Sequence, residues 1–284
     1  MTTPTTRRFL QAAGLLVAGL LLAACGKKEP PAAPVAGGAA SASPPAARVY
    51  VVGTDAAYAP FESQNEKGEI VGFDIDVVRA VAQKAGMEVK FVNTPWEGIF
   101  NSLQQGDRDL LVSAITITDE RRQSMDFTAP YFDAHQLIAV KQGSKVARFD
   151  DLKALKVGVQ TGTTGEEAVT RLQGKNSPNI KRFESTPLAL KELDAGGVDA
   201  VVADNGVVVN YLANNAAAGV KPVSDPSFVP EQYGIAVRKG NAELLQKLNQ
   251  GLAGIKADGT YDRIHAGYFG ARPAAAAPAS AASR

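Results

Sequence analysis

The chain has 284 residues, of which 45% are hydrophobic, so it is long enough to bury a large apolar core without cross-links. Its 30 Lys and Arg residues almost balance its 29 Asp and Glu residues, and no basic patch is interleaved with aromatics, which argues against a nucleic-acid partner. The single Cys excludes an internal disulfide, and two His residues are too few for a His-based metal site, so we predict no metal or other cofactor.

The amino-terminal segment has the features of an export signal. Arg7 and Arg8 precede an uncharged apolar run at residues 12–24, which is too short for a comfortable transmembrane span. The run ends in Leu-Ala-Ala-Cys, the pattern of a bacterial lipobox. We therefore expect residues 1–24 to be a lipoprotein signal peptide and Cys25 to carry the lipid. The two arginines do not decide between the Sec and the twin-arginine export routes.

Two segments have a composition that cannot form a core. Pro, Ala, Gly and Ser dominate residues 25–47, which show no hydrophobic periodicity. We interpret this stretch as a disordered tether, which at ~3 Å per residue could reach ~70 Å from a membrane. Residues 271–284 have the same character and are expected to form a disordered tail.

Strands and helices alternate between these segments. The pattern predicts strands at 49–52, 89–92 and 110–112, with helices at 74–86 and 98–105. A second series begins with the strand at 156–159. Its further elements are helices at 166–172, 187–193, 206–214 and 243–257 and a buried strand at 200–203. Such alternation indicates an α/β fold with parallel sheets, and the two series suggest two lobes.

Several chemistry-bearing residues follow the strands of the first series. Asp55 and Tyr58 come after the first strand, and loops at the carboxyl ends of strands in α/β sheets are where ligands bind. Trp96, the only Trp, is expected in a loop between a strand and a helix, where it can face a cleft. Both aromatics could instead belong to the core. Phe61 suits the core better, whereas Glu62 allows either interpretation.

Arg121 lies in the segment 113–122, which follows a buried strand. Its guanidinium is always charged and matches a carboxylate with two parallel hydrogen bonds. The alternative is a solvated helix-surface charge paired with Asp119 or Glu120. For Arg122 we keep that surface interpretation.

Two further candidate sites follow strands of the second series. The loop at 160–165 has small residues before a helix, so its backbone N–H groups could hold an anion. Phosphate is one possibility, although the Lys of a P-loop is missing, and Thr163 or Thr164 could also simply cap the helix. Asp204 follows the strand at 200–203, where a carboxylate in a water-poor cleft needs a partner. It could bind a ligand or cap the next helix.

Together these segments resemble the periplasmic solute-binding proteins of ABC importers for polar amino acids. The resemblance extends over nearly all of residues 48–270 and includes the segments 125–132 and 258–261. No single motif is decisive, but their order along the chain is specific. One departure is that some relatives carry a disulfide in the first lobe, which this chain cannot form.

The resemblance implies that the candidate residues bind an amino acid. Arg121, Thr163 and Thr164 would contact its α-carboxylate, and Asp204 would pair with its α-ammonium. The remaining roles are a hydroxyl contact from Thr116, a carbonyl of Ala114 that accepts from the ammonium, two aromatic walls from Tyr58 and Trp96, and a carboxylate near the side-chain end from Asp55.

The resemblance also supplies a chain order, that of the two-lobed type II periplasmic-binding-protein fold. Lobe 1 would comprise residues 48–133 and 233–270, and lobe 2 would comprise residues 134–232. Residues 135–140 and 233–237 would be the two crossing strands, so His135 would be structural. Periodicity alone does not show this interruption. The lobes would close over the ligand by bending at the crossing strands.

The function implied is that of the substrate-binding lipoprotein of an ABC amino-acid importer, not an enzyme. It would be a monomer in the periplasm or at the cell surface, anchored by lipid on Cys25, and would deliver its ligand to a permease with its ATPase. The sequence looks nearest to binders of arginine, lysine or histidine, with a glutamine binder as the close alternative. A dehydratase of the prephenate/arogenate kind shares this fold, but no spare proton-transfer group stands out beyond Glu62 and Glu97. A receptor's sensor module is disfavoured because no transmembrane helix or signalling domain follows.

Overall fold

The computed structural model describes residues 48–215 and 219–270. The predicted signal peptide, the predicted lipidation site Cys25, the predicted tether and the predicted tail all lie outside these described residues. Within the described part, no helix is long and apolar enough to cross a membrane. The architecture is mixed α/β, with two five-stranded sheets, which confirms the fold class expected from the alternating pattern.

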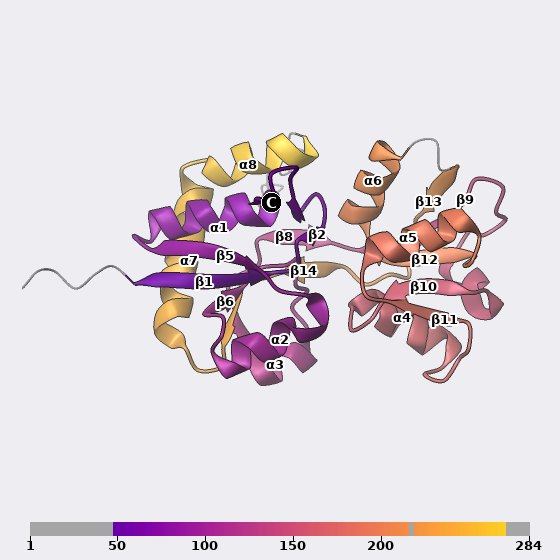
Figure 1. The fold of residues 1–284 in the computed structure, drawn as a ribbon, viewed down its shortest axis with the longest axis horizontal. Helices are drawn as coiled ribbons and strands as arrows, with labels where there is room; N and C mark the ends of the chain where they lie inside the picture. Colours follow the sequence, from indigo (N-terminus) through magenta and orange to yellow (C-terminus); the bar gives the residue numbers. More distant parts are fainter. Residues whose placement is uncertain (1–47, 216–218, 271–284) are drawn as a thin grey trace, which may run out of the picture. The chain divides into compact units, whose positions relative to one another are not determined.

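The first sheet has the strand order β5-β1-β6-β15-β7, of which β5, β1 and β6 are labelled in Figure 1. Its second strand, β1 (Val49–Thr54), pairs in parallel with β5 (Glu88–Asn93) and with β6 (Leu110–Leu111). The strand β15 (Ala236–Arg238) pairs antiparallel with β6 and with β7 (Met125–Phe127). A strand from the end of the folded chain therefore completes a sheet that begins at its start.

Helices from both ends of the folded chain pack against this sheet and against one another. They are α1 (Phe73–Lys84), α2 (Trp96–Gln105), α3 (Asp119–Ser124), α7 (Ala242–Ala257) and α8 (Thr260–Phe269). The predicted apolar face of α1 is buried, since Ile75, Val78 and Val81 are fully inaccessible and join the same core as Leu248 of α7.

Gly72, which precedes α1, is required by close packing. Its φ of 139° lies in a region that L side chains rarely adopt, and an added Cβ would lie 2.1 Å from the carbonyl oxygen of Phe61. The tight approach lets the amides of Phe73 and Asp74 donate to the carbonyls of Pro60 and Phe61. The chain is thereby folded back on itself just before the helix begins.

The second sheet has the order β11-β10-β12-β9-β13. Its parallel strands are β10 (Val157–Gln160), β11 (Ile180–Phe183) and β12 (Ala200–Asp204). Its antiparallel strands are β9 (Gln136–Lys141) and β13 (Val220–Val223). The accompanying helices are the 3-10 helix η1 (Phe149–Ala154), α4 (Thr164–Gln173), α5 (Thr186–Ala195) and α6 (Asn205–Asn214).

A two-stranded antiparallel ladder joins the sheets: β8 (Phe132–Ala134) and β14 (Glu231–Tyr233) (Figure 1). The predicted crossing strands at 135–140 and 233–237 were wrong, because β9 belongs to the second sheet and β15 to the first. Those runs are apolar because they are buried in the sheets, whereas the true crossing strands are short and partly polar. His135 lies between β8 and β9, outside any strand.

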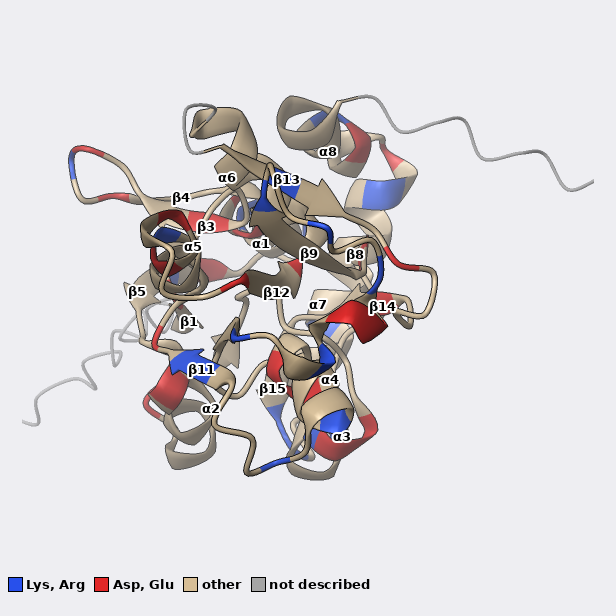
Figure 2. Ribbon diagram, turned by 90° about the vertical axis from the view of Figure 1, so that its right-hand side faces the viewer, with Lys and Arg blue, Asp and Glu red and all other residues tan. Residues whose placement is uncertain are grey.

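The predicted lobe boundaries at 133/134 and 232/233 fall within this ladder and remain a prediction. A small three-stranded sheet of β2 (Ala57–Tyr58), β3 (Glu62–Gln64) and β4 (Ile70–Val71) was not anticipated, since its strands are too short for a periodic signal. Basic and acidic residues are interspersed over the described part (Figure 2), as the balanced composition suggested.

Candidate functional site

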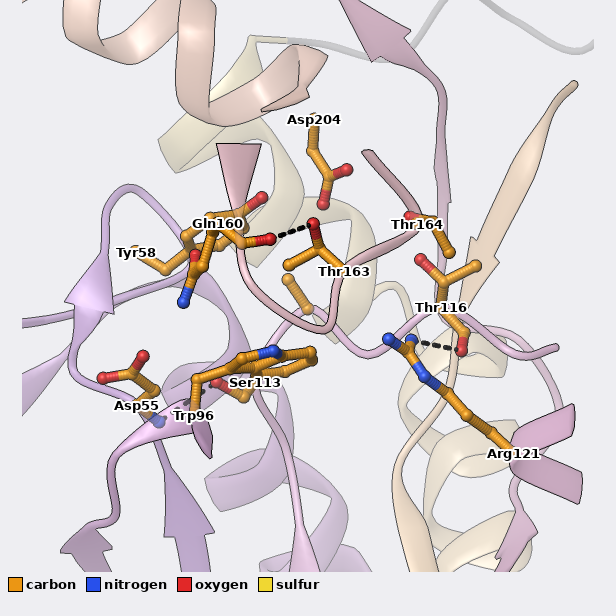
Figure 3. Close-up of a pocket in the computed structure, with 11 residues that line it drawn as sticks. Asp55, Tyr58, Trp96, Ser113, Thr116, Arg121, Gln160, Thr163, Thr164 and Asp204 are labelled. Atoms are coloured by element: carbon orange, nitrogen blue, oxygen red, sulfur yellow. Dashed lines mark hydrogen bonds between the residues drawn. The ribbon is translucent and has the colours of Figure 1, made fainter. Parts of the chain in front are cut away.

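One pocket brings together residues from both sheets (Figure 3). It lies beyond the carboxyl ends of β1, β6, β10 and β12. Its lining residues are Asp55, Tyr58, Trp96, Ser113, Ala114, Thr116, Arg121, Gln160, Thr163, Thr164 and Asp204. All nine sequence-predicted binding residues are therefore neighbours, and their roles toward a ligand remain predictions.

Arg121 is held by backbone carbonyls from two distant segments. Its Nη1 donates to the carbonyl of Thr116 at 2.9 Å, and its Nη2 donates to the carbonyl of Gly162 at 3.2 Å. Its guanidinium carbon also lies 5.4 Å from the ring centroid of Trp96 and 5.2 Å from that of Phe100. Burial lowers the pKa of Arg121, and nearby carboxylates oppose that shift. The guanidinium of Arg121 is therefore a cation fixed in the pocket by hydrogen bonds rather than a solvated surface charge. Arg122, in contrast, is exposed.

Thr163 and Thr164 lie at the amino-terminal end of α4. Thr163 is the N-cap, because its hydroxyl accepts from the amide of Glu166 at 3.2 Å and donates to the carbonyl of Gln160 at 2.8 Å. The capping interpretation is thus correct for Thr163, and it coexists with a position on the pocket wall. The start of α4 contributes the positive end of a helix dipole to this side of the pocket.

Asp204 is the last residue of β12, and only 7% of it is exposed. Its carboxylate accepts from Gln136 Nε2 at 2.6 Å and from the Tyr233 hydroxyl at 2.5 Å. Although it occupies the N-cap position of α6, its side chain makes no capping hydrogen bond. Burial, followed by the negative charge of Glu231, raises the pKa of Asp204 to about 6. A buried carboxylate of this kind is suited to receive a cation from the pocket.

Another part of the pocket carries Asp55, Tyr58 and Trp96. Trp96 is the first residue of α2 rather than a loop residue, because the helix begins two residues before the predicted start at residue 98. Tyr58 lies on β2 and is partly buried. Burial raises the pKa of Asp55, while hydrogen bonds from the Trp96 backbone and the Gln160 side chain lower it. This part therefore offers two aromatic surfaces and one carboxyl group.

Ser113 and Gln160 were not singled out from the sequence, although both lie in segments that were. The hydroxyl of Ser113 accepts from the Asp55 amide at 3.0 Å and donates to Glu62 Oε1 at 3.0 Å. Gln160 Oε1 accepts from the amide and the hydroxyl of Thr186 at 3.2 and 3.0 Å. Their positions at strand ends were the available signal, because such positions adjoin the pocket whatever the residue type.

Two buried carboxyl groups form hydrogen bonds with residues that line the pocket. Glu62 and Asp74 are fully inaccessible, and Asp74 accepts from the Ala114 amide and the Tyr131 hydroxyl, each at 2.7 Å. Burial raises the pKa of Asp74 to about 6, and burial together with Asp74 raises that of Glu62. Asp74 thereby fixes Ala114, which has the left-handed φ of 46° that non-glycine residues rarely adopt.

The pocket can recognise groups of both charge signs. Arg121 and the start of α4 present hydrogen-bond donors, whereas Asp204 and the carbonyls nearby present acceptors. Among residues 48–215 and 219–270, no group of three or more His, Cys, Asp or Glu side chains is placed to hold a metal ion. The arrangement suits a small zwitterionic or cationic solute.

Two sheets, the ladder between them and a pocket at their strand ends define a two-lobed binding protein of the periplasmic type. The chain belongs to the bacterial extracellular solute-binding proteins, family 3, whose sequence model matches residues 50–271. This match confirms the family expected from the sequence motifs.

Individual relatives are similar over most of their length. A probable histidine-binding protein of Neisseria gonorrhoeae is 47% identical over 223 residues, which cover 78% of this chain and 83% of that protein. The ABC transporter arginine-binding protein 1 of Escherichia coli strain K12 is 36% identical over 79% of this chain and 92% of that protein. The crystal structure of the arginine-, lysine-, histidine-binding protein ArtJ from Geobacillus stearothermophilus has a TM-score of 0.77 at 46% identity, covering 80% of this chain and 97% of that chain.

Proposed function

We propose that this protein captures a basic L-amino acid, arginine, lysine or histidine, and delivers it to the permease of an ABC importer. One observation carries the proposal: the pocket has a guanidinium and a helix amino terminus on one side and the buried carboxylate of Asp204 on the other. These charges are complementary to the carboxylate and the ammonium of an α-amino acid. The similarity to histidine- and arginine-binding relatives supports the choice of a basic side chain.

The α-carboxylate would lie against Arg121 and the first amides of α4. A guanidinium has five N–H groups, and two of those of Arg121 bond to the carbonyls of Thr116 and Gly162. Three remain for the ligand, enough for two parallel hydrogen bonds to a carboxylate. Thr163 and Thr164 would add backbone amides at the positive end of the helix.

The ligand side chain would extend toward Asp55, Tyr58 and Trp96. A guanidinium, ammonium or imidazolium group can stack on the aromatic faces and pair with the carboxylate. Burial raises the pKa of Asp55, so a cation would also favour its ionised form. Glutamine is the alternative ligand, because a neutral carboxyl group at Asp55 would hydrogen-bond well to an amide.

Binding would be coupled to closure of the two lobes. The hydrogen bond from Arg121 to Gly162 links the first lobe to the loop before α4, and Trp96 approaches the same loop. A ligand that contacts both lobes at once stabilises the closed arrangement over an open one. The short β8–β14 ladder is the segment about which such closure would bend.

Export and membrane attachment are part of the same proposal. The lipobox at residues 22–25 supports cleavage before Cys25 and lipid attachment there, which would hold a monomer at the periplasmic or cell-surface side of a membrane. Replacing Cys25 by Ser should move the protein from the membrane fraction to the soluble fraction of cells that express it. Retention of the variant in the membrane fraction would contradict lipid anchoring.

The proposal does not include catalysis. The two residues considered as proton-transfer groups for a dehydratase do not line the pocket: Glu62 is buried behind Ser113, and Glu97 is exposed on α2. An acid or base must reach the proton that it transfers, and neither side chain does so from these positions.

Calorimetric titration of the purified protein with each of the twenty L-amino acids tests the proposal. The protein should first be unfolded and refolded to remove any ligand carried through purification. We expect tight binding of arginine, lysine or histidine, loss of that binding in Arg121→Ala, and little change in Arg122→Ala, the exposed neighbour. Binding of glutamine alone would correct the ligand class, and no binding of any amino acid would refute the proposal.

A further inference from the structure

Glu231 lies at the start of β14, in a stretch without any recognised motif, and its carboxylate meets both lobes. The Thr116 hydroxyl donates to its Oε2 at 2.6 Å, and the Thr164 hydroxyl donates to the same oxygen at 2.9 Å. Its other oxygen, Oε1, accepts from Gln136 Nε2 at 2.9 Å. One side chain on the connecting ladder thus binds two threonines that both line the pocket.

Hydrogen-bond counting fixes what these threonines can offer to a ligand. A hydroxyl has one hydrogen to donate and two lone pairs that accept. Since a carboxylate oxygen only accepts, the hydrogen of the Thr116 hydroxyl points to Glu231 and not into the pocket. The part of Thr116 Oγ1 that faces the pocket can therefore only accept. It suits an ammonium, which only donates, and would repel a carboxylate.

The same counting applies to Thr164. Its hydroxyl hydrogen is also committed to Glu231, at 2.9 Å. A ligand carboxylate near Thr164 would then be bound through the backbone amides of α4, not through this hydroxyl. Glu231 consequently leaves neither threonine hydroxyl with a hydrogen to donate to a ligand.

We infer that Glu231 is a positioning residue that holds the Thr116 hydroxyl as an acceptor for the ligand's α-ammonium group and, through Thr116 and Thr164, ties the two lobes together in the closed state. The inference rests on the proposed function, because it assigns an orientation to an amino acid in this pocket. Gln136 extends the arrangement, since the same Nε2 donates to Glu231 and to Asp204, the second acceptor for the ammonium.

Isothermal titration calorimetry with L-arginine on single and double variants tests this inference. Glu231→Gln, which keeps the shape and removes the charge, should weaken binding about 10- to 100-fold, the range for losing a hydrogen bond to a charged group. Thr116→Val should cause a loss of similar size. In the Thr116→Val background, Glu231→Gln should add less than about threefold, because the partner through which it acts is already missing.

Two comparisons separate positioning from a general structural effect. Thr116→Ser retains the hydroxyl, so in that background Glu231→Gln should again weaken binding about tenfold. Glu243→Gln removes the same charge from an exposed side chain of α7 that pairs with Lys247, and it should bind arginine as the wild type does. A merely structural role of Glu231 would give equal losses in the Thr116→Val and Thr116→Ser backgrounds.

The outcomes distinguish failure of this inference from failure of the proposed function. If the wild type binds none of the twenty amino acids, the proposed function fails, and this inference fails with it. If the wild type binds arginine but Glu231→Gln binds equally well, only the inference is overturned. It is also overturned if the losses in Glu231→Gln and Thr116→Val multiply in the double variant. Should Glu231→Gln not fold, Thr116→Val must still weaken binding at least tenfold, and wild-type affinity in that variant would refute the assigned contact.

Discussion

Arginine binding should weaken as the pH falls through 6, because Asp204 must be ionised to pair with an α-ammonium group. Burial and the charge of Glu231 raise the pKa of Asp204 to about 6, and hydrogen bonds from Tyr233, Tyr58 and Gln136 limit the rise. An ammonium that enters the pocket favours the ionised carboxylate, so binding must expel the proton wherever Asp204 holds one.

The magnitude follows from the ionised fraction of a group with a pKa of about 6. About nine-tenths of Asp204 is ionised at pH 7 and about one-tenth at pH 5, so the apparent Kd should rise roughly tenfold between them. The α-ammonium and guanidinium groups of L-arginine stay charged over this range, and its carboxylate stays ionised. The change therefore belongs to the protein.

Calorimetry in buffers of different ionisation enthalpy measures both the affinity and the protons released. About half a proton should leave per arginine bound at pH 6 and almost none at pH 7.5. Asp204→Asn should bind more weakly and should lose most of the pH dependence, whereas Asp126→Asn, a change outside the pocket, should retain it. An affinity that is constant from pH 5 to pH 7 in the wild type, or an unchanged slope in Asp204→Asn, would refute the reasoning.

Three further predictions concern the clamp, a turn and the buried carboxyl pair. Arg121→Lys should weaken arginine binding at least ~10-fold, since an ammonium cannot form two parallel hydrogen bonds to a carboxylate. If calorimetry showed wild-type affinity for this variant, the guanidinium of Arg121 would not be the group that binds the ligand carboxylate. Gly72→Ala should lower the free energy of unfolding, measured in urea, by ~3 kcal/mol or more, because its Cβ would meet the Phe61 carbonyl. As a control, Gly98→Ala on α2, where an added Cβ meets open space, should raise the free energy of unfolding by ~0.5–1 kcal/mol. Equal effects of the two substitutions would contradict the packing argument. For Asp74, whose folded-state pKa is raised from 3.8 to about 6, the associated stability is present below pH 3.8 and is lost as the pH rises through about 6. This pKa shift corresponds to at most ~3 kcal/mol of stability. Urea titrations should therefore find the ligand-free wild type more stable at pH 5 than at pH 7, and the stability of Asp74→Asn should depend less on pH. An equal pH dependence in both proteins would exclude this role of Asp74.

The sequence was informative where a long amphipathic helix or a charged side chain gave a clear pattern. The periodic positions of α1 and α7 predicted helices that the structure reproduces to within about two residues. Asp204 could be found because a carboxylate at the end of a buried strand needs a partner, whereas Arg121 was preferred over a surface charge only through the family resemblance. Their neighbours in the pocket followed from the family resemblance rather than from periodicity.

Short and polar elements left no such pattern. The crossing strands β8 and β14 have three residues each, so the apolar strands beside them were mistaken for the crossing. Trp96 was assigned to a loop because the helix was expected to begin at Gly98, whereas Pro95 occupies the N-cap position. Glu231 gave no signal at all, because its importance depends on contacts with Thr116 and Thr164, more than 60 residues away in the chain.

The place of β15 in the first sheet has a consequence for the order of folding. This strand lies between β6 and β7, yet the whole second sheet precedes it in the chain. In a polypeptide that emerges amino end first, residues 136–223 supply every strand of the second sheet before residue 236 is available. Until then β6 and β7 each present an unpaired backbone edge. The lobe that is begun first is therefore finished last, and a nascent chain stopped before residue 236 would contain one complete sheet and one that is split in two.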